Sequence, residues 1–225
     1  MLQDAPGAGT SEACPRCGKP DALCLCDGIV PLDNRVALLI LQHPQEQDVE
    51  LGTARLTALH LKDATLKIGL SWPSLTKALG RPADPRRWAV LYLGSASAAA
   101  LAPGRDVVVL DRKGAAERDQ EGVLGEIQGI VVLDGTWSQA KALWWRNPWL
   151  LKCRRVVLGA RRPSRYGALR REPRRDGLAT IEAVAQLIGR IEGRPELTAA
   201  LEASFTRLLE RYRATRRPGR PARRR

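Results

Sequence analysis

Residues 129–137 read GIVVLDGTW, and the chain continues as SQAK over residues 138–141. Its run of β-branched and aliphatic residues is typical of a strand buried on both faces. Thr136 then stands where a helix N-cap is expected, before a helical pattern that begins at Trp137. Asp134 and Thr136 are therefore expected at the carboxyl end of a central strand, where open α/β sheets bind ligands. The alternative is a plain strand-to-helix turn in which Thr136 caps the helix and Trp137 only packs.

The rest of the chain alternates short apolar runs with helical patterns, which predicts an α/β fold. Five further strands are expected at residues 35–42, 64–69, 88–93, 106–110 and 154–158, and four further helices at residues 53–59, 73–79, 178–188 and 196–212. His43 directly follows the first of these strands, and Arg55 lies in the first turn of the next helix. His43 either serves a site or is structural, and Arg55 either binds an anion or is simply solvated.

Four cysteines gather near the amino end as two close pairs, Cys14 with Cys17 and Cys24 with Cys26. Two such pairs joined by a short polar loop present four thiolates to one tetrahedral ion, as a structural zinc site requires. The second pair is separated by one residue where the commoner zinc pattern has two, and incidental free thiols are the alternative. Four cysteine ligands would leave no position for water, so the site would be structural rather than catalytic. Cys153 stands alone and is expected in the core.

The composition is strongly basic, with 37 Lys and Arg against 24 Asp and Glu and a formal net charge of +13. A charge of this size repels itself unless a polyanion is near, and arginine suits phosphate contacts, so nucleic acid is the expected partner. Arginines crowd one segment above all, where phosphate binding would release counterions. That segment contains Arg161, Arg162, Arg165, Tyr166 and Arg170.

No apolar run is long enough for a transmembrane helix, so no membrane partner is expected. The first residues lack the charged and apolar regions of a signal peptide, which predicts a cytoplasmic protein with reduced cysteines. The sequence leaves the oligomeric state open.

Several separate motifs occur in an order that resembles the DTW-domain family of tRNA-uridine aminocarboxypropyltransferases, whose signature is Asp-x-Thr-Trp. They are the two cysteine pairs, His43-Pro-Gln-Glu46, Thr53-Ala-Arg55, Asp134-Gly-Thr-Trp137, Tyr166-Gly-Ala-Leu-Arg-Arg-Glu-Pro173 and Ala179-Thr-Ile-Glu-Ala183. The resemblance covers nearly all of residues 14–188. Two positions depart from it: Ala179 replaces a usual serine, and Leu93-Gly94 stand where proline often occurs. The lost hydroxyl at position 179 suggests a modest change in the grip on the cofactor.

The resemblance implies a SPOUT-like α/β fold with a C-terminal trefoil knot that holds S-adenosylmethionine. We accordingly expect a disordered lead-in at residues 1–13 and a zinc-binding cysteine segment at residues 14–30. A DTW/SPOUT-like catalytic domain is expected at residues 31–215, followed by a basic disordered tail at residues 216–225.

The resemblance also implies transfer of the 3-amino-3-carboxypropyl group of S-adenosylmethionine to N3 of a uridine in a tRNA loop, with release of methylthioadenosine. Asp134, Thr136 and Trp137 would be catalytic, with Asp134 acting either as the base or as the group that holds the cofactor's amino group. The cofactor contacts would come from Leu93, Gly94, Asp134, Gly135, Thr136, Thr180 and Glu182. The RNA contacts would come from His43, Arg55, Arg161, Arg162, Arg165, Tyr166 and Arg170.

Three other functions remain open. A SPOUT-like RNA methyltransferase would release adenosylhomocysteine instead of methylthioadenosine. A non-catalytic, zinc-containing RNA-binding module would need only the cysteines and arginines, and would leave the strand end at Asp134–Trp137 unexplained. Aminocarboxypropylation of ribosomal RNA differs from the first function only in its substrate.

Overall fold

A six-stranded sheet forms the centre of the computed structural model, which describes residues 13–91, 106–111, 113–159, 164–169 and 178–216. The strand order is β2-β1-β5-β3-β6-β4. All neighbouring strands run parallel except β4, which pairs with β6 in the antiparallel sense. The strands are β1 Ala37–Gln42, β2 Ala64–Ile68, β3 Trp88–Leu91, β4 Val107–Leu110, β5 Gly129–Asp134 and β6 Arg154–Leu158.

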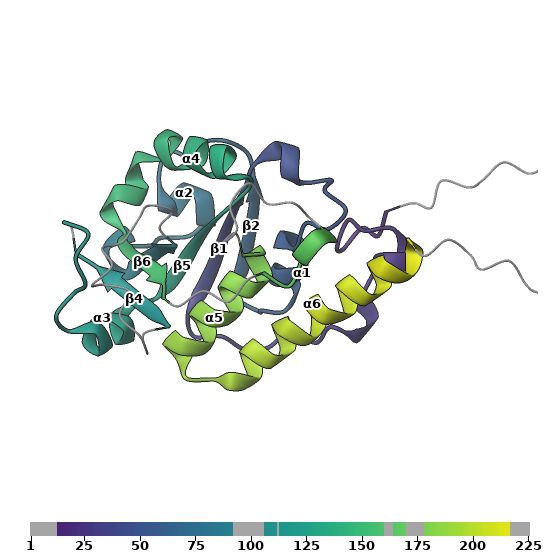
Figure 1. The fold of residues 1–225 in the computed structure, drawn as a ribbon. Coiled ribbons are helices and arrows are strands. Elements are labelled where there is room, and N and C mark those ends of the chain that lie inside the picture. Colours follow the sequence, from purple (N-terminus) through teal and green to yellow (C-terminus); the bar gives the residue numbers. More distant parts are fainter. Residues whose placement is uncertain (1–12, 92–105, 112, 160–163, 170–177, 217–225) are drawn as a thin grey trace, which may run out of the picture.

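Helices cover both faces of the sheet, which makes a three-layer α/β/α arrangement (Figure 1). In β5, Ile130 and Val132 pack on the side of α1, α5 and α6, whereas Val131 and Leu133 pack on the side of α2 and α4. This explains the uninterrupted apolar run, because a strand between two helical layers has no face left for water. The helices are α1 Ala54–Leu59, α2 Leu75–Leu79, α3 Gln120–Glu126, α4 Trp137–Arg146, α5 Thr180–Glu192 and α6 Pro195–Thr215.

Six short 3₁₀ helices complete the described secondary structure. They are η1 Asp21–Leu23, η2 Cys26–Gly28, η3 Pro44–Glu46, η4 Pro85–Arg87, η5 Pro148–Lys152 and η6 Gly167–Leu169. Within the described ranges, no helix combines the length and the apolar character needed to cross a membrane.

The cysteine segment packs against the carboxyl-terminal end of α6 (Figure 1). Leu23, Leu25 and Ile29 belong to the same apolar core as Leu208 and Leu209. The segment therefore shares the main hydrophobic core instead of forming one of its own.

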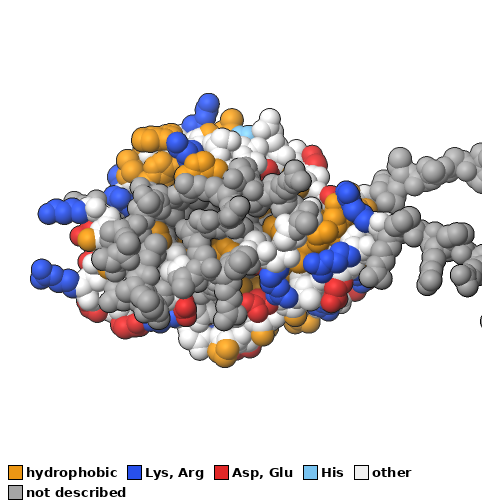
Figure 2. Space-filling model, viewed as in Figure 1, with side chains coloured by type: hydrophobic (Ala, Val, Ile, Leu, Met, Phe, Trp, Pro, Cys, Tyr) orange, Lys and Arg blue, Asp and Glu red, His pale blue; other side chains and the backbone are white. Residues whose placement is uncertain are grey.

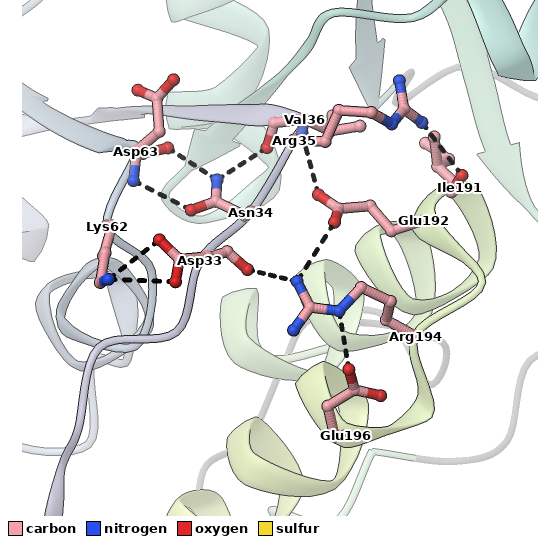
Figure 3. A network of polar contacts seen from close by, with 10 residues as sticks. All are labelled: Asp33, Asn34, Arg35, Val36, Lys62, Asp63, Ile191, Glu192, Arg194 and Glu196. Carbon is pink, nitrogen blue, oxygen red and sulfur yellow. Dashed lines mark hydrogen bonds and ion pairs between the residues drawn. The ribbon is translucent and has the colours of Figure 1, made fainter.

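A polar network connects the residues just before β1 to the turn between α5 and α6 (Figure 3). The backbone N–H of Val36 donates to Glu192 at 2.8 Å, and Arg194 donates to the carbonyl of Asp33 at 2.5 Å. Arg35 donates to the carbonyls of Ile127 and Ile191. This network fixes the amino end of the strand whose carboxyl end enters the candidate site.

The expected strands and helices all occur, with some shifts at their ends. The first strand begins at Ala37 rather than at residue 35, and α5 begins at Thr180 and continues to Glu192. The mixed α/β class is confirmed. The connections that a trefoil knot would involve include residues 92–105, 160–163 and 170–177, which lie outside the described residues, so the knot stays a prediction. The expected lead-in and tail lie outside them as well, apart from Ala13 and Arg216.

Candidate active site and cysteine cluster

Asp134, the last residue of β5, is the point where three elements meet. Its side chain is only 8% exposed. Gln42, at the matching position of β1, donates from Nε2 to Asp134 Oδ2 at 2.9 Å. Thr180, the first residue of α5, donates a close hydrogen bond from Oγ1 to Asp134 Oδ1. Each carboxylate oxygen is thus held by one side chain from another element.

Gln42 adds an unused acceptor to this site. Its Oε1 is buried and has no hydrogen-bond partner within the described part of the chain. The amide must present Nε2 to the carboxylate, because the reverse orientation would set oxygen against oxygen. A carboxylate has about four lone-pair sites, so Asp134 also keeps acceptor capacity beyond the two bonds described. Together, the two side chains suit a ligand group that donates N–H hydrogen bonds.

The start of α4 lies directly after Asp134 and is closed by a capping box. Gln139 Oε1 accepts from the backbone N–H of Thr136 at 2.6 Å, and Thr136 Oγ1 accepts from that of Gln139 at 3.5 Å. A Cβ atom at Gly135 would lie 2.8 Å from the Cβ of Gln139, so the turn requires glycine. Gln139 also donates to the side chain of Gln45 at 3.1 Å, which joins α4 to the loop after β1.

Glu182 connects two segments of the chain at the other side of the site. Its Oε2 accepts from Ser164 Oγ at 2.6 Å and from the backbone N–H of Ala179 at 2.9 Å. Its Oε1 accepts from the backbone N–H of Arg165 at 2.9 Å. These three hydrogen bonds join residues 164–165 to the start of α5, so the buried carboxylate of Glu182 positions one segment against the other.

The loop before α1 accepts hydrogen bonds at three consecutive backbone carbonyls. Lys19, 4% exposed, donates from Nζ to the carbonyls of Glu50 and Gly52, both at 2.7 Å. Tyr166 donates from its hydroxyl to the carbonyl of Leu51 at 2.6 Å. We call residues 50–52 with these two donors the carbonyl clamp.

The carbonyl clamp leads directly into the site. Thr53 comes next in the chain, and its Oγ1 accepts from the backbone N–H of Ile181 in the first turn of α5 at 3.3 Å. The preceding residue, Thr180, is the one that holds Asp134. The cysteine segment is thereby connected, contact by contact, to the candidate active site.

The predicted RNA-binding residues take different places. His43 is half-buried. Its backbone N–H donates to the carbonyl of Asp134 at 2.9 Å, and its Nδ1 accepts from the backbone N–H of Gln45. Arg55 runs toward Gly18 of the cysteine segment, and its Nε is buried without a partner in the described ranges. Arg165 is exposed and extends along α6, where it donates to Thr206. Leu93, Gly94, Arg161, Arg162 and Arg170 lie outside the described residues.

The structure corrects the assignment of Tyr166. The sequence predicts an RNA contact, but the side chain is only 2% exposed. Its ring stands edge-on to Phe205 at a centroid distance of 5.0 Å, and its hydroxyl belongs to the carbonyl clamp. A ring packed in the core cannot stack on a base, so Tyr166 has a structural role.

Sequence reasoning missed Gln42, Thr53 and Lys19. A glutamine that ends an otherwise aliphatic strand was a signal for Gln42. Thr53 was recognised only as part of a helix start, and nothing in the local pattern around Lys19 indicated that its ammonium is buried.

The four cysteines of the amino-terminal segment form one cluster. All their sulfur atoms lie within 4.8 Å of one another, with Cys14 Sγ 3.7 Å from Cys26 Sγ and Cys17 Sγ 3.8 Å from Cys24 Sγ. Sulfurs about 2.3 Å from a tetrahedral zinc ion lie about 3.8 Å apart, so the cluster has the size of a zinc site.

The turn between the first two cysteines favours metal binding as well. Gly18 closes it with φ of 70°, a left-handed conformation that suits glycine. Backbone N–H groups of Cys17 and Arg16 lower the pKa of the Cys14 thiol to about 6, whereas burial and the neighbouring thiols raise the pKa of the Cys26 thiol. Cys153 is buried in the core on the α2 and α4 side of the sheet, as expected.

Comparison with known proteins gives one family and several relatives. The DTW domain matches residues 11–213. The chain is 32% identical over 192 residues to tRNA-uridine aminocarboxypropyltransferase 2 of Drosophila melanogaster, which covers 84% of this chain and 70% of the fly protein. It is 28% identical over 184 residues to the protein of that name from Macaca fascicularis, and 29% identical over 184 residues to the one from Mus musculus.

The last two alignments each cover 80% of this chain but only 56% of the relative, so the chain spans little more than half the length of those proteins. No solved structure gives a significant match. The domain match takes in both cysteine pairs, the Asp134–Trp137 motif and the start of α5. The chain belongs to the DTW domain family.

Proposed function

We propose that the protein transfers the 3-amino-3-carboxypropyl group of S-adenosylmethionine to N3 of a uridine in a tRNA loop, which forms acp3U and releases methylthioadenosine. The observation that carries this proposal is the Asp-Gly-Thr-Trp motif of a DTW-domain chain, which holds Asp134 at the meeting point of β1, β5 and α5. The names of the three relatives and the net charge of +13 support the same substrate class.

The reaction needs correct positioning more than activation. The sulfonium of the co-substrate already makes its attached carbons electrophilic. Uridine N3 loses its proton, its electron pair forms the bond to the methylene carbon, and the carbon–sulfur pair stays on sulfur as a neutral thioether. The protein must therefore choose the carbon that meets N3 and accept the imide proton.

Asp134 is the residue that we assign to this choice. Its remaining lone pairs and the free Oε1 of Gln42 suit the N–H donors of the reaction, which are the uridine imide and the amino group of the transferred chain. Asp134 acts either as the base for the imide proton or as the acceptor that orients the amino group. Asp134→Asn separates the two roles, because asparagine still accepts a hydrogen bond but cannot take the proton. The amide of Gln42 can turn to pair with the asparagine, so this variant should fold.

The positive end of the α4 dipole complements the negative carboxylate of the transferred chain. Helix N-termini favour anions, so Thr136 and the first turn of α4 suit the carboxylate of the transferred chain. Trp137 would form one side of the co-substrate site or stack on the uracil. Thr180 holds Asp134 in place from the side of α5, where the proposed SPOUT-like knot would enclose S-adenosylmethionine.

We also propose one structural zinc ion bound to Cys14, Cys17, Cys24 and Cys26. The 3.7 and 3.8 Å sulfur separations support this metal, and four thiolates leave no position for a catalytic water. Thiolates of this kind persist in a reducing compartment, which supports a cytoplasmic location.

The experiment is mass spectrometry of nucleosides from unmodified tRNA incubated with the full chain and S-adenosylmethionine. The expected product is a uridine heavier by one aminocarboxypropyl group, with methylthioadenosine released and neither compound formed by Asp134→Ala. Binding of S-adenosylmethionine to Asp134→Asn is measured in parallel by calorimetry. Unchanged binding of S-adenosylmethionine without product assigns the base role, whereas unchanged binding with product assigns the orienting role.

Two results would overturn the proposal. A methylated nucleoside together with adenosylhomocysteine would establish a methyltransferase. Tight tRNA binding without any product, under conditions where ribosomal RNA is modified, would move the substrate to ribosomal RNA.

A further inference from the structure

One exposed tryptophan is not explained by the fold. Trp145 is 74% exposed, although a tryptophan buries roughly 150–250 Å² where it packs. Two nearby tryptophans do pack. Trp144 packs against the core on the α2 and α4 side of the sheet, and Trp149 is buried and donates to the carbonyl of Trp72 at 3.0 Å. Packing therefore accounts for Trp144 and Trp149 but not for Trp145.

Trp145 lies on the same strip of α4 as the active-site motif. Residues four apart neighbour each other on a helix, so Trp137, Lys141 and Trp145 follow one another along one face. The eight residue-to-residue steps from Trp137 to Trp145 span about 12 Å along the helix axis. The strip begins at the candidate site and leads outward over exposed surface.

The segment that carries Trp145 has charges of one sign. Residues 137–152 contain Lys141, Arg146 and Lys152 and no Asp or Glu. All three cations are exposed, and so is Leu151 in η5, which packs beside α4. Figure 2 shows hydrophobic and basic side chains next to each other at the top of the molecule, where α4 lies. We call Lys141, Trp145, Arg146, Leu151 and Lys152 the α4 platform.

This combination favours RNA over a second copy of the chain. A two-fold interface through the α4 platform would set its cations against the same cations of the other copy, and no acidic residue of this segment could neutralise them. Single-stranded nucleic acid satisfies both features, because bases stack on aromatic rings and phosphates pair with lysine and arginine.

We propose that the α4 platform binds unpaired nucleotides of the RNA next to the target uridine, with a base stacked on Trp145 and backbone phosphates on Lys141 and Arg146. This rests on the proposed function, which makes tRNA the substrate. N3 lies on the pairing edge of uracil, so the target uridine is unpaired, and in a tRNA loop its neighbours are unpaired as well. A platform that starts at Trp137 is in the right place to receive them.

The test compares variants of the zinc-loaded full chain for binding to labelled, unmodified tRNA by fluorescence anisotropy over a range of salt concentrations. Trp145→Ala should weaken binding about tenfold, which corresponds to the loss of one base stack, and Trp145→Phe should retain most of it. Lys141→Ala should lower the slope of log K against log salt by about 0.7–0.9. Matched controls are Val30→Ala, which alters an equally exposed apolar residue in the cysteine segment, and Lys113→Ala, which removes an exposed cation after β4.

Binding of S-adenosylmethionine and the melting temperature should be the same in all variants, which would show that the fold and the reaction site are intact. Platform variants that bind and modify tRNA as the wild type does would overturn the platform and leave the proposed function standing. A wild type that binds no tRNA would overturn both. If light scattering finds a dimer that Trp145→Ala dissociates while tRNA binding is unchanged, the surface is a contact between copies and the proposal is wrong.

Discussion

The buried ammonium of Lys19 connects the cysteine segment to the loop that precedes the candidate site, and its removal should destabilise the whole domain. Lys19→Met keeps a side chain of similar length and removes the two hydrogen bonds to Glu50 and Gly52. The backbone of Lys19 also closes the cysteine turn, because its carbonyl accepts from the backbone N–H of Cys14 at 2.8 Å. That bond is unaffected by the substitution, so the closure of the cysteine turn should survive it.

The expected loss follows from the burial of all the groups involved. Each carbonyl left unpaired inside the protein costs about 1–3 kcal/mol. Removing a buried charge offsets part of the combined loss, because the ammonium no longer has to leave water. We expect a net loss of about 2–3 kcal/mol. In a protein of this size 1 kcal/mol shifts the melting temperature by about 2–4 °C, so Lys19→Met should melt about 4–12 °C lower.

The assay is thermal unfolding of the zinc-loaded chain followed by circular dichroism. Lys62→Met is the control, because its 2.9 Å ion pair with Asp33 is exposed and such pairs contribute only about 0–1 kcal/mol. Zinc content is measured on both variants, so that loss of metal is not mistaken for loss of the clamp. If the two variants, equally loaded with zinc, melt at the same temperature, the assigned role of Lys19 is refuted.

Three further predictions concern other parts of the chain. Ala179→Ser should stabilise α5 by about 1 kcal/mol, because it supplies the missing N-cap opposite Glu182; a thermal melt that is unchanged or lower would contradict this. Burial, together with the charge of Arg207, lowers the pKa of His60 from 6.5 to about 4. Between pH 6.5 and 4 the unfolded chain is therefore protonated at His60 while the native chain is not. The free energy of unfolding is full above pH 6.5 and falls by up to about 3 kcal/mol as the pH drops from 6.5 to 4. His60→Leu should remove that loss in urea unfolding at several pH values, and an unchanged pH slope would count against it. Cys26→Ser should release zinc in elemental analysis, whereas Cys153→Ser should retain it; equal retention would exclude Cys26 as a ligand.

Much of the architecture follows from local patterns. The apolar run at residues 130–133 predicted a doubly buried strand, and β5 is buried at every position. Thr136 was expected to cap a helix and does so. The spacing of the amino-terminal cysteines predicted a four-sulfur cluster, which the structure confirms. The motif at residues 134–137 indicated the family that the comparison with known proteins bears out.

Other features depend on which segments meet in space. The sense of β4 was not predictable from its sequence, since an apolar run of four residues suits either direction beside β6. Tyr166 lies within an arginine-rich segment and was expected at the surface, yet its ring packs on Phe205 in α6.

Local sequence patterns account for the strands, the helices and the cysteine cluster, because each of these is encoded by residues that are near one another in the chain. The family was recognisable from the order of several separate motifs. The hydrogen bonds from Gln42 and Thr180 to Asp134, and those from Lys19 to the loop at residues 50–52, arise instead from the packing of the folded chain. These partners are 31 to 92 positions apart. They meet because β1 and β5 pair in register and α5 begins above them, which the packing of the whole sheet sets and no local pattern records.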